Sequence, residues 1–250
     1  MPENPTFEVP SEFENSKDLL AKFSLLGHRT GIRQRDEFFF PQFDESRVQL
    51  RELLEQTPDE LRLQKYLEEH PVLLAHAALG GFYSVASVRS ALFAQVGLGR
   101  ELQMDFAYCT GNSAGVYWTF IELERPDVPI FTKAGDPSKQ LSHALRQILD
   151  WTSWLQQHQE YARHILDDLI RSSPMRWGWS DVLYRKPSYM IIIGRRASLN
   201  PETNRRRAQL CDQYHGLEIV TWDRLLDDYR GGDDVPFENS RLVSEGDVEV

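Results

Sequence analysis

The chain is poor in cysteine and contains no long apolar run. Cys109 and Cys211 are its only cysteines, lie far apart, and form no CxxC pair. The sequence therefore indicates neither a zinc knuckle nor a disulfide framework. Nowhere do about 18 apolar residues follow one another, and the opening MPENPTFEVPSEFENSKDLL lacks the basic start and apolar core of an export signal. We expect a cytoplasmic protein without a membrane span.

Positive charge is also scarce. The 250 residues include 28 Lys and Arg against 38 Asp and Glu, which gives a formal net charge of -10. Such a balance argues against a surface held broadly to nucleic acid, although one local basic patch on an acidic protein still permits binding. Hydrophobic residues make up 41% of the chain, enough to bury one substantial core.

Three regions are expected along the chain. Residues 1–50 are interpreted as an N-terminal extension, in which a helix near 45–56 and a strand around 36–41 are predicted. Residues 51–230 form the main domain. Residues 231–250 are polar and acidic, which is typical of a disordered tail.

The first helix of the main domain has clear start and stop signals. In TPDELRLQKYLEEHP, Thr57 is the predicted N-cap, Pro58 the first helical residue, and Glu60 the acid that completes a capping box. The helix is expected to run to about residue 70, where Pro71 stops it.

The rest of the main domain alternates between the periods of strands and helices. A helix, three meandering strands, a helix and a further strand predict an α/β sandwich with a mixed sheet. The predicted elements are strands over 82–96, 101–110 and 116–124, one long helix or two over 136–172 with Ser138 as cap, a buried strand over 187–194, a helix over 201–213, a strand over 217–222, and a helix over 223–230.

Acids occur on two neighbouring strands where apolar residues are expected. Along WTFIELERPD the alternation of side chains places Glu122 and Glu124 on one face. Asp105 lies within the preceding strand, and a hairpin through the turn GNSAG would place it opposite Glu122 to within a residue or two. The sequence thus predicts two or three carboxylates at one point of the sheet.

Two interpretations of these acids remain open. Like charges this close raise one another's pKa unless a cation lies among them, and Mg²⁺ or Mn²⁺ prefers such oxygen ligands. Alternatively, Glu122 and Glu124 lie in water beyond the strand end, and Asp105 pairs with an arginine such as Arg125.

Several ordered blocks resemble the catalytic region of the Shedu family of bacterial anti-phage defence proteins. The blocks are LQKYLEEHP, MDFAY, FIELERPD, FTKAGDPSKQLSHALRQILDWTSWL, YMIIIGRRASL and LEIVTWDRLL, and they cover roughly residues 57–229. Shedu proteins resemble PD-(D/E)XK nucleases. The resemblance implies a restriction-endonuclease-like core, with a mixed central sheet flanked by helices. It also implies metal-dependent cleavage or nicking of phage DNA by a homo-oligomer.

The resemblance assigns roles to three residues, and the chain departs from the family's motif at a fourth position. Asp105 and Glu122 match the two metal ligands of the motif, and Gln147 matches a glutamine on the following helix. The motif expects a lysine two residues after the second acid, where this chain has Glu124. A lysine would orient water and stabilise charge on the phosphate, whereas a glutamate binds metal or acts as a base.

This departure leaves three interpretations of the site. Glu124 is a further ligand that favours two metals, or a lysine from elsewhere, with Lys133 nearest in sequence, takes the vacant role. In the third interpretation the chemistry has lapsed, and the fold serves as a DNA-binding or sensing module.

The helix that carries Gln147 also places His143 and Trp151 on the same face, at intervals of four residues. With that face toward the sheet, Gln147 could hold a water or a phosphate oxygen beside the metal. The alternative is that Gln147 satisfies a buried backbone group and His143 is a surface histidine.

Further acids and a basic pair are candidates for the same site. Related nucleases often add an acid from the first helix, where Glu60 and Glu68 share a face, although Glu60 has a competing role in the capping box. Arg195 and Arg196 directly follow a buried strand and could receive phosphate oxygens, or they could be solvated.

Overall fold

The computed structural model describes residues 16–21, 42–79, 89–112, 115–173, 186–214 and 216–227. Its centre is a five-stranded sheet with the strand order β1-β2-β3-β4-β5. The first three strands are antiparallel, and the last two run parallel to β3, so the predicted mixed sheet is confirmed. The strands are β1 (Arg89–Leu98), β2 (Leu102–Asn112), β3 (Gly115–Leu123), β4 (Ser188–Ile192) and β5 (Leu217–Val220).

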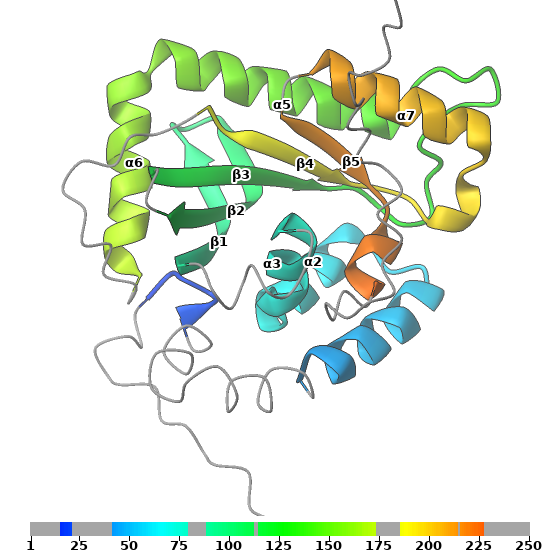
Figure 1. Ribbon diagram of the computed structural model, residues 1–250, viewed down its shortest axis with the longest axis horizontal. Coiled ribbons are helices and arrows are strands. Elements are labelled where there is room, and N and C mark those ends of the chain that lie inside the picture. Colours follow the sequence, from blue (N-terminus) through cyan, green and yellow to red (C-terminus); the bar gives the residue numbers. More distant parts are fainter. Residues whose placement is uncertain are drawn as a thin grey trace, which may run out of the picture.

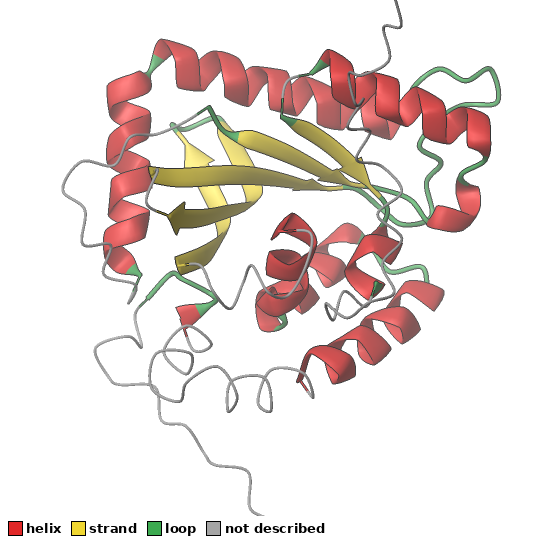
Figure 2. Cartoon of the chain, viewed as in Figure 1, coloured by secondary structure: helices red, strands yellow, loops and turns green. Residues whose placement is uncertain are grey.

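Helices cover both faces of this sheet (Figures 1 and 2). On one face lie α5 (Lys139–Gln157), α6 (Gln159–Ser172) and α7 (Pro201–Gln213). On the other lie a helix over 42–55, α2 (Glu60–Glu69), α3 (Pro71–Leu79) and the 3-10 turn η3 (Trp222–Leu226). The result is a three-layer α/β arrangement.

Alternation along β3 supplies both layers of the core. Trp118 and Phe120 pack toward α5, whereas Ile121 and Leu123 pack toward α2 and α3. All four are almost completely buried. Because burying one large apolar side chain contributes about 1.5–3 kcal/mol, this strand holds the two layers together.

The helices that follow β3 begin and end at local signals. Ser138 caps α5 by accepting a hydrogen bond from the backbone N–H of Leu141. The helical path is interrupted at His158, so the predicted long segment forms two helices. Helix α7 begins at Pro201 after a capping box formed by Asn200 and ends at Gln213, as the sequence predicts.

The predicted cap of α2 is wrong. Asp59, not Thr57, is the N-cap, and its side chain accepts from the backbone N–H of Arg62. Thr57 has a φ of 48° and its N–H bonds to the carbonyl of Leu54, so it belongs to the end of the preceding helix. Glu60 is therefore the first residue of α2, and no capping box engages its side chain.

Three further features differ from the predicted elements. Residues 71–79 form α3, which sequence periodicity did not reveal. The predicted helix over 223–230 is the short turn η3, and its last residues lie outside the described chain. The helix over 42–55 buries leucines in the core, although most of it falls within the region interpreted as an extension.

Several predictions concern residues beyond the described parts. The strand around 36–41, the start of the first predicted strand over 82–88, and the acidic tail over 231–250 all lie outside them. Within the described residues, no helix has the length and apolar character required to cross a membrane.

Candidate active site

The register of β2 and β3 brings two acids together. The ladder pairs Phe106 with Ile121, and one further step in the same register places Asp105 opposite Glu122, as the sequence predicts. Asp105 Oδ2 accepts a hydrogen bond of 2.8 Å from the backbone N–H of Leu123. This bond fixes the Asp105 carboxylate beside the end of β3.

A cavity of about 370 Å³ lies at this point. Helices from both layers contribute to its wall, since α2 supplies Glu60 and α5 supplies His143 and Gln147. The complete lining is Glu60, Gln95, Gln103, Asp105, Glu122, Leu123, Glu124, His143 and Gln147. We call this space the acidic cavity.

The acids are not in open water. Glu122 is only 5% exposed and Glu124 only 7%. Arg125 pairs with Asp127 through two hydrogen bonds and not with Asp105. The alternative in which solvent and Arg125 neutralise these carboxylates is therefore wrong.

Glu124 is held by its backbone on two sides. Its N–H bonds to the carbonyl of Ile192 at 2.9 Å, and its carbonyl accepts from Trp222 Nε1 at 2.7 Å. The bond to Ile192 continues the β3–β4 pairing beyond the end of β3, and the bond from Trp222 ties Glu124 to η3. The Glu124 side chain lines the acidic cavity, with its Oε1 3.5 Å from His143 Nδ1.

Helix α5 places His143 and Gln147 one turn apart on the cavity wall. The His143 side chain is 63% exposed, so it stands at the cavity mouth. Gln147 Oε1 is buried and has no hydrogen-bond partner among the described residues. A buried acceptor without a partner costs folding free energy. A water or a cation bound to this oxygen would offset that cost.

The two acids predicted on α2 have different positions. Glu60 lines the acidic cavity, whereas Glu68 does not. Glu68 instead accepts a hydrogen bond of 3.1 Å from Gln64 Nε2 on the same helix. The first turn of α2 is therefore the part that contributes to the site.

The electrostatics of the cavity are dominated by Glu122. The pKa of Glu122 is raised to about 9. Burial is the largest cause, and repulsion from Asp105, Glu124 and Glu60 also contributes. A side-chain hydrogen bond with Gln147 acts in the opposite direction. Without a cation, Glu122 is therefore protonated at neutral pH.

The other acids of the cavity are perturbed in the same direction. The pKa of Asp105 is raised to about 6, mainly by burial. The hydrogen bond from the Leu123 N–H lowers this pKa, and repulsion from Glu60 raises it. Burial, Glu60 and Asp105 raise the pKa of Glu124 to about 7. The pKa of Glu60 is also raised by burial, although His143 lowers it.

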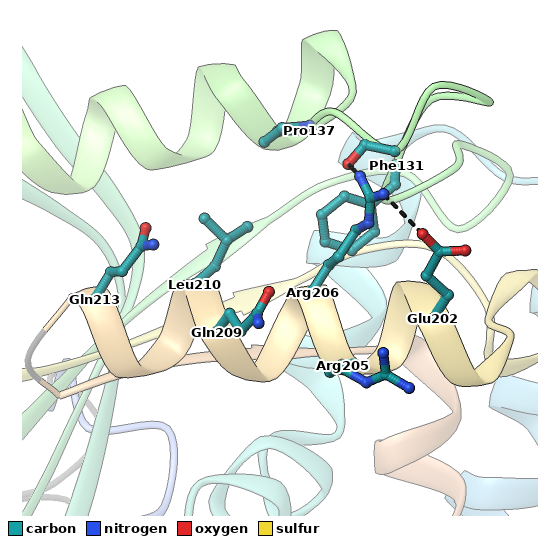
Figure 3. Close-up of a pocket in the computed structure, with 9 residues that line it drawn as sticks. Phe131, Pro137, Glu202, Arg205, Arg206, Gln209, Leu210 and Gln213 are labelled. Carbon is teal, nitrogen blue, oxygen red and sulfur yellow. Dashed lines mark hydrogen bonds and ion pairs between the residues drawn. The ribbon is translucent and has the colours of Figure 1, made fainter.

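Lys133 does not line this cavity. It is exposed on the loop over 131–137, which is closed by a bridge between Phe131 and Pro137. Figure 3 shows how Arg206 of α7 lies against this loop, where its guanidinium donates to the Gly135 carbonyl at 2.6 Å and to Glu202 at 2.7 Å. The loop is thus held against α7, and no Lys or Arg is among the described residues that line the acidic cavity.

Arg195 and Arg196 follow β4 as predicted but are paired with acids of η3 and its end. Arg195 binds Asp223 at 3.0 Å, and Arg196 binds Asp227 at 2.6 Å. Gly194 makes this turn with a φ of 64°, where an added Cβ would lie 2.8 Å from a backbone oxygen. Neither arginine lines the acidic cavity.

Sequence reasoning did not single out Gln95 and Gln103 as parts of the site. Gln103 was detectable, because it shares a strand face with Asp105. Gln95 has a φ of 53° and interrupts the β1–β2 ladder opposite Asp105. The place of Gln95 in the cavity wall follows from the register of two strands and not from any local pattern in the sequence.

The fold and the site define an α/β protein in which the mixed sheet and helix α2 bring four acids around one cavity. The family model of the C-terminal region of the Shedu protein SduA matches residues 58–226. The chain therefore belongs to the Shedu family, whose members take part in anti-phage defence. No curated protein matches the chain.

Proposed function

We propose that this protein is a metal-dependent nuclease with a PD-(D/E)XK core, which hydrolyses phosphodiester bonds of phage DNA in the cytoplasm. The observation that carries this proposal is the convergence of Asp105, Glu122 and Glu124 on one cavity whose described wall contains neither lysine nor arginine. Burial of like charges is costly, and a bound divalent cation is the simplest compensation.

The donor atoms of the cavity fit a hard cation. Carboxylate and amide oxygens are the ligands preferred by Mg²⁺ and Mn²⁺, and Gln147 Oε1 is an unpaired acceptor in the same wall. Within the described residues, no three side chains among His, Cys, Asp and Glu already stand close enough to share one ion. Binding would therefore require the side chains to rotate toward one another and Glu122 to lose its proton.

The proposed roles follow from the positions of the side chains. Asp105 and Glu122 would hold the ion, and a divalent cation so bound would supply Lewis-acid chemistry to a phosphodiester. Glu124, whose Oε1 lies 3.5 Å from His143 Nδ1, would accept a proton from the attacking water. Gln147 would orient that water through its amide oxygen.

The lack of a cationic side chain favours a second candidate function. No lysine or arginine is among the described residues of the cavity wall, so none stabilises charge on the phosphate there. A DNA-binding or sensing module that retains the fold without the chemistry would show this feature. In either case we propose that the protein acts as a homo-oligomer.

The experiment is a cleavage assay on the full chain with plasmid and linear DNA, in Mn²⁺, in Mg²⁺ and in EDTA. We expect cleavage with metal, loss of cleavage in Glu122→Gln and Asp105→Asn, and full activity in the control Glu101→Gln, which changes an exposed acid between β1 and β2. Cleavage that survives Glu122→Gln would refute the proposal. DNA binding without cleavage, unaffected by EDTA, would support the binding module instead.

A further inference from the structure

A second cavity, of about 760 Å³, lies between α7, β5 and η3. Three arginines line it: Arg196 after β4, Arg207 on α7, and Arg224 in η3. Glu218 and Asp227 are the acids in its wall. We call this space the arginine cavity, and its lining is positive in a chain whose net charge is -10.

The position of Arg207 is fixed. Its Nη1 donates to the carbonyl of Ile219 at 3.0 Å, and its Nη2 donates to Asn204 Oδ1 at 2.7 Å. Burial lowers the pKa of Arg207, and repulsion from Arg196 and Arg224 lowers it further. Three arginines outnumber the two acids of the wall even though Arg196 pairs with Asp227, and a bound anion would offset the remaining positive charge.

The helix beside this cavity adds to the attraction for an anion. Helix α7 begins at the cavity, with its N-cap Asn200 and first residue Pro201 in the wall. The positive end of the helix dipole therefore faces the same space as the arginines.

The arginine cavity and the acidic cavity open along one edge of the sheet. Glu124 follows β3, Arg195 and Arg196 come after β4, and Thr221 follows β5. Backbone bonds tie these ends together, from Gly194 N–H to the Arg125 carbonyl and from Trp222 N–H to the Gly194 carbonyl, both at 3.1 Å. Ligands of α/β proteins commonly bind outside the carboxyl ends of parallel strands, which is where both cavities lie.

We propose that the arginine cavity binds a phosphate group of a nucleic acid strand whose scissile bond lies at the acidic cavity. The identification of the ligand as nucleic acid rests on the proposed function. The proposal of an anion site rests only on the residues that line the arginine cavity. The Arg196–Asp227 ion pair opens when the phosphate replaces the Asp227 carboxylate.

The test measures binding of a fluorescein-labelled single-stranded DNA oligonucleotide to the full chain by anisotropy, in EDTA, across a salt series. Arg196→Gln removes a charge from the cavity wall. Asn204→Asp adds a negative charge while keeping the acceptor for Arg207, and Glu218→Gln removes a negative charge. The matched control is Arg205→Gln, an exposed arginine of α7 outside this cavity.

We expect Arg196→Gln and Asn204→Asp to weaken binding about fivefold and to reduce the slope of log K against log salt by about 1. Glu218→Gln should tighten binding about threefold, and Arg205→Gln should leave it within about twofold of the native chain. Asn204→Asp and Glu218→Gln are nearly isosteric, and circular dichroism confirms that each variant is folded.

Two outcomes would overturn the proposal. One is unchanged binding in both Arg196→Gln and Asn204→Asp; the other is an equal loss in Arg205→Gln, which would reveal a general effect of net charge. A nucleoside monophosphate that displaces the labelled oligonucleotide as effectively as unlabelled oligonucleotide would show that the ligand is a free nucleotide. The assignment to a nucleic acid strand would then be overturned. Because no metal is present, failure of the nuclease proposal would not alter these results.

Discussion

Replacing Glu122 by glutamine is expected to stabilise the metal-free protein at neutral pH, although it removes a side chain on which the proposed chemistry depends. The Glu122 carboxyl is buried among Asp105, Glu124 and Glu60, which raises its pKa from 4.5 to about 9. Glutamine has nearly the same shape, carries no charge, and can still bond with Gln147. The substitution therefore removes an electrostatic cost without leaving a void.

The sign and size of the effect follow from the two pKa values of Glu122. A carboxyl whose folded pKa is raised contributes stability that is fully present below pH 4.5 and is lost as the pH rises through about 9. At about 1.4 kcal/mol for each pH unit, the native chain at pH 7 bears a cost of about 3 kcal/mol that the variant lacks. For a chain of this length, that corresponds to about 6–12 °C in Tm.

The assay is thermal unfolding in EDTA at a series of pH values from 4 to 8.5, with urea unfolding at pH 7 as a second measure. Glu122→Gln and the native chain should have nearly equal stability at pH 4, and the difference should grow toward pH 8.5. Glu101→Gln, at an exposed turn, is the matched control and should show no such growth.

The result that would refute this reasoning is a Glu122→Gln variant no more stable than the native chain at pH 7. A gain that is the same at pH 4 and pH 8.5 would also refute it, because the effect would then come from packing and not from charge. Either outcome would mean that burial of the Glu122 carboxyl carries no large electrostatic cost, and the argument for a compensating cation would fail.

Three other measurements test separate parts of the structure. The pKa values of the cavity acids Asp105, Glu124 and Glu122 are about 6, 7 and 9, so affinity for Mn²⁺ in calorimetry should rise with pH across that range; a constant affinity would contradict ionic binding. Asp18→Ala should cost about 2–3 kcal/mol in urea unfolding, because buried Asp18 accepts from backbone N–H groups, whereas the exposed Asp168→Ala should cost little. Gly135→Ala should cost about 1–2 kcal/mol of stability, because φ is 86° there and the new Cβ would displace the Arg206 guanidinium. The loop over 131–137 should then separate from α7 and become sensitive to proteolysis, and unchanged proteolysis would contradict this contact.

The elements that the sequence predicted well carry their own signals. Helix α7 has a proline at its start and a cap before it, and β4 is a short apolar run that ends near a glycine. The opposition of Asp105 and Glu122 was also predictable to within a residue or two, because the short connection between two strands limits the register of a hairpin.

Other elements could not be predicted from local sequence. Helix α3 is apolar on every side and so has no periodic face to detect, since it is buried between other elements. The choice of Asp59 over Thr57 as cap depends on the helix over 42–55, whose end occupies Thr57. Thr57 and Asp59 are both good N-cap residues when the sequence of α2 is considered alone.

The wall of the acidic cavity illustrates the same limit. Glu60 and His143 come from helices on opposite faces of the sheet, yet both line the cavity beside the end of β3. Likewise, the pairing of Arg195 with Asp223 depends on how η3 folds back after β5. Such contacts are set by the packing of layers, which no spacing in the sequence records.

The way the acids are anchored limits how the site can respond to a cation. The Leu123 N–H holds the Asp105 carboxylate, while Ile192 and Trp222 hold the Glu124 backbone on either side. The strands therefore cannot separate to relieve the repulsion without breaking hydrogen bonds inside the sheet. Relief must come from protonation, as the raised pKa of Glu122 shows, or from an ion that draws the side chains inward. A cation that binds here must displace protons from these carboxyl groups. Its affinity therefore depends on pH and reflects the free energy needed to ionise them in the cavity.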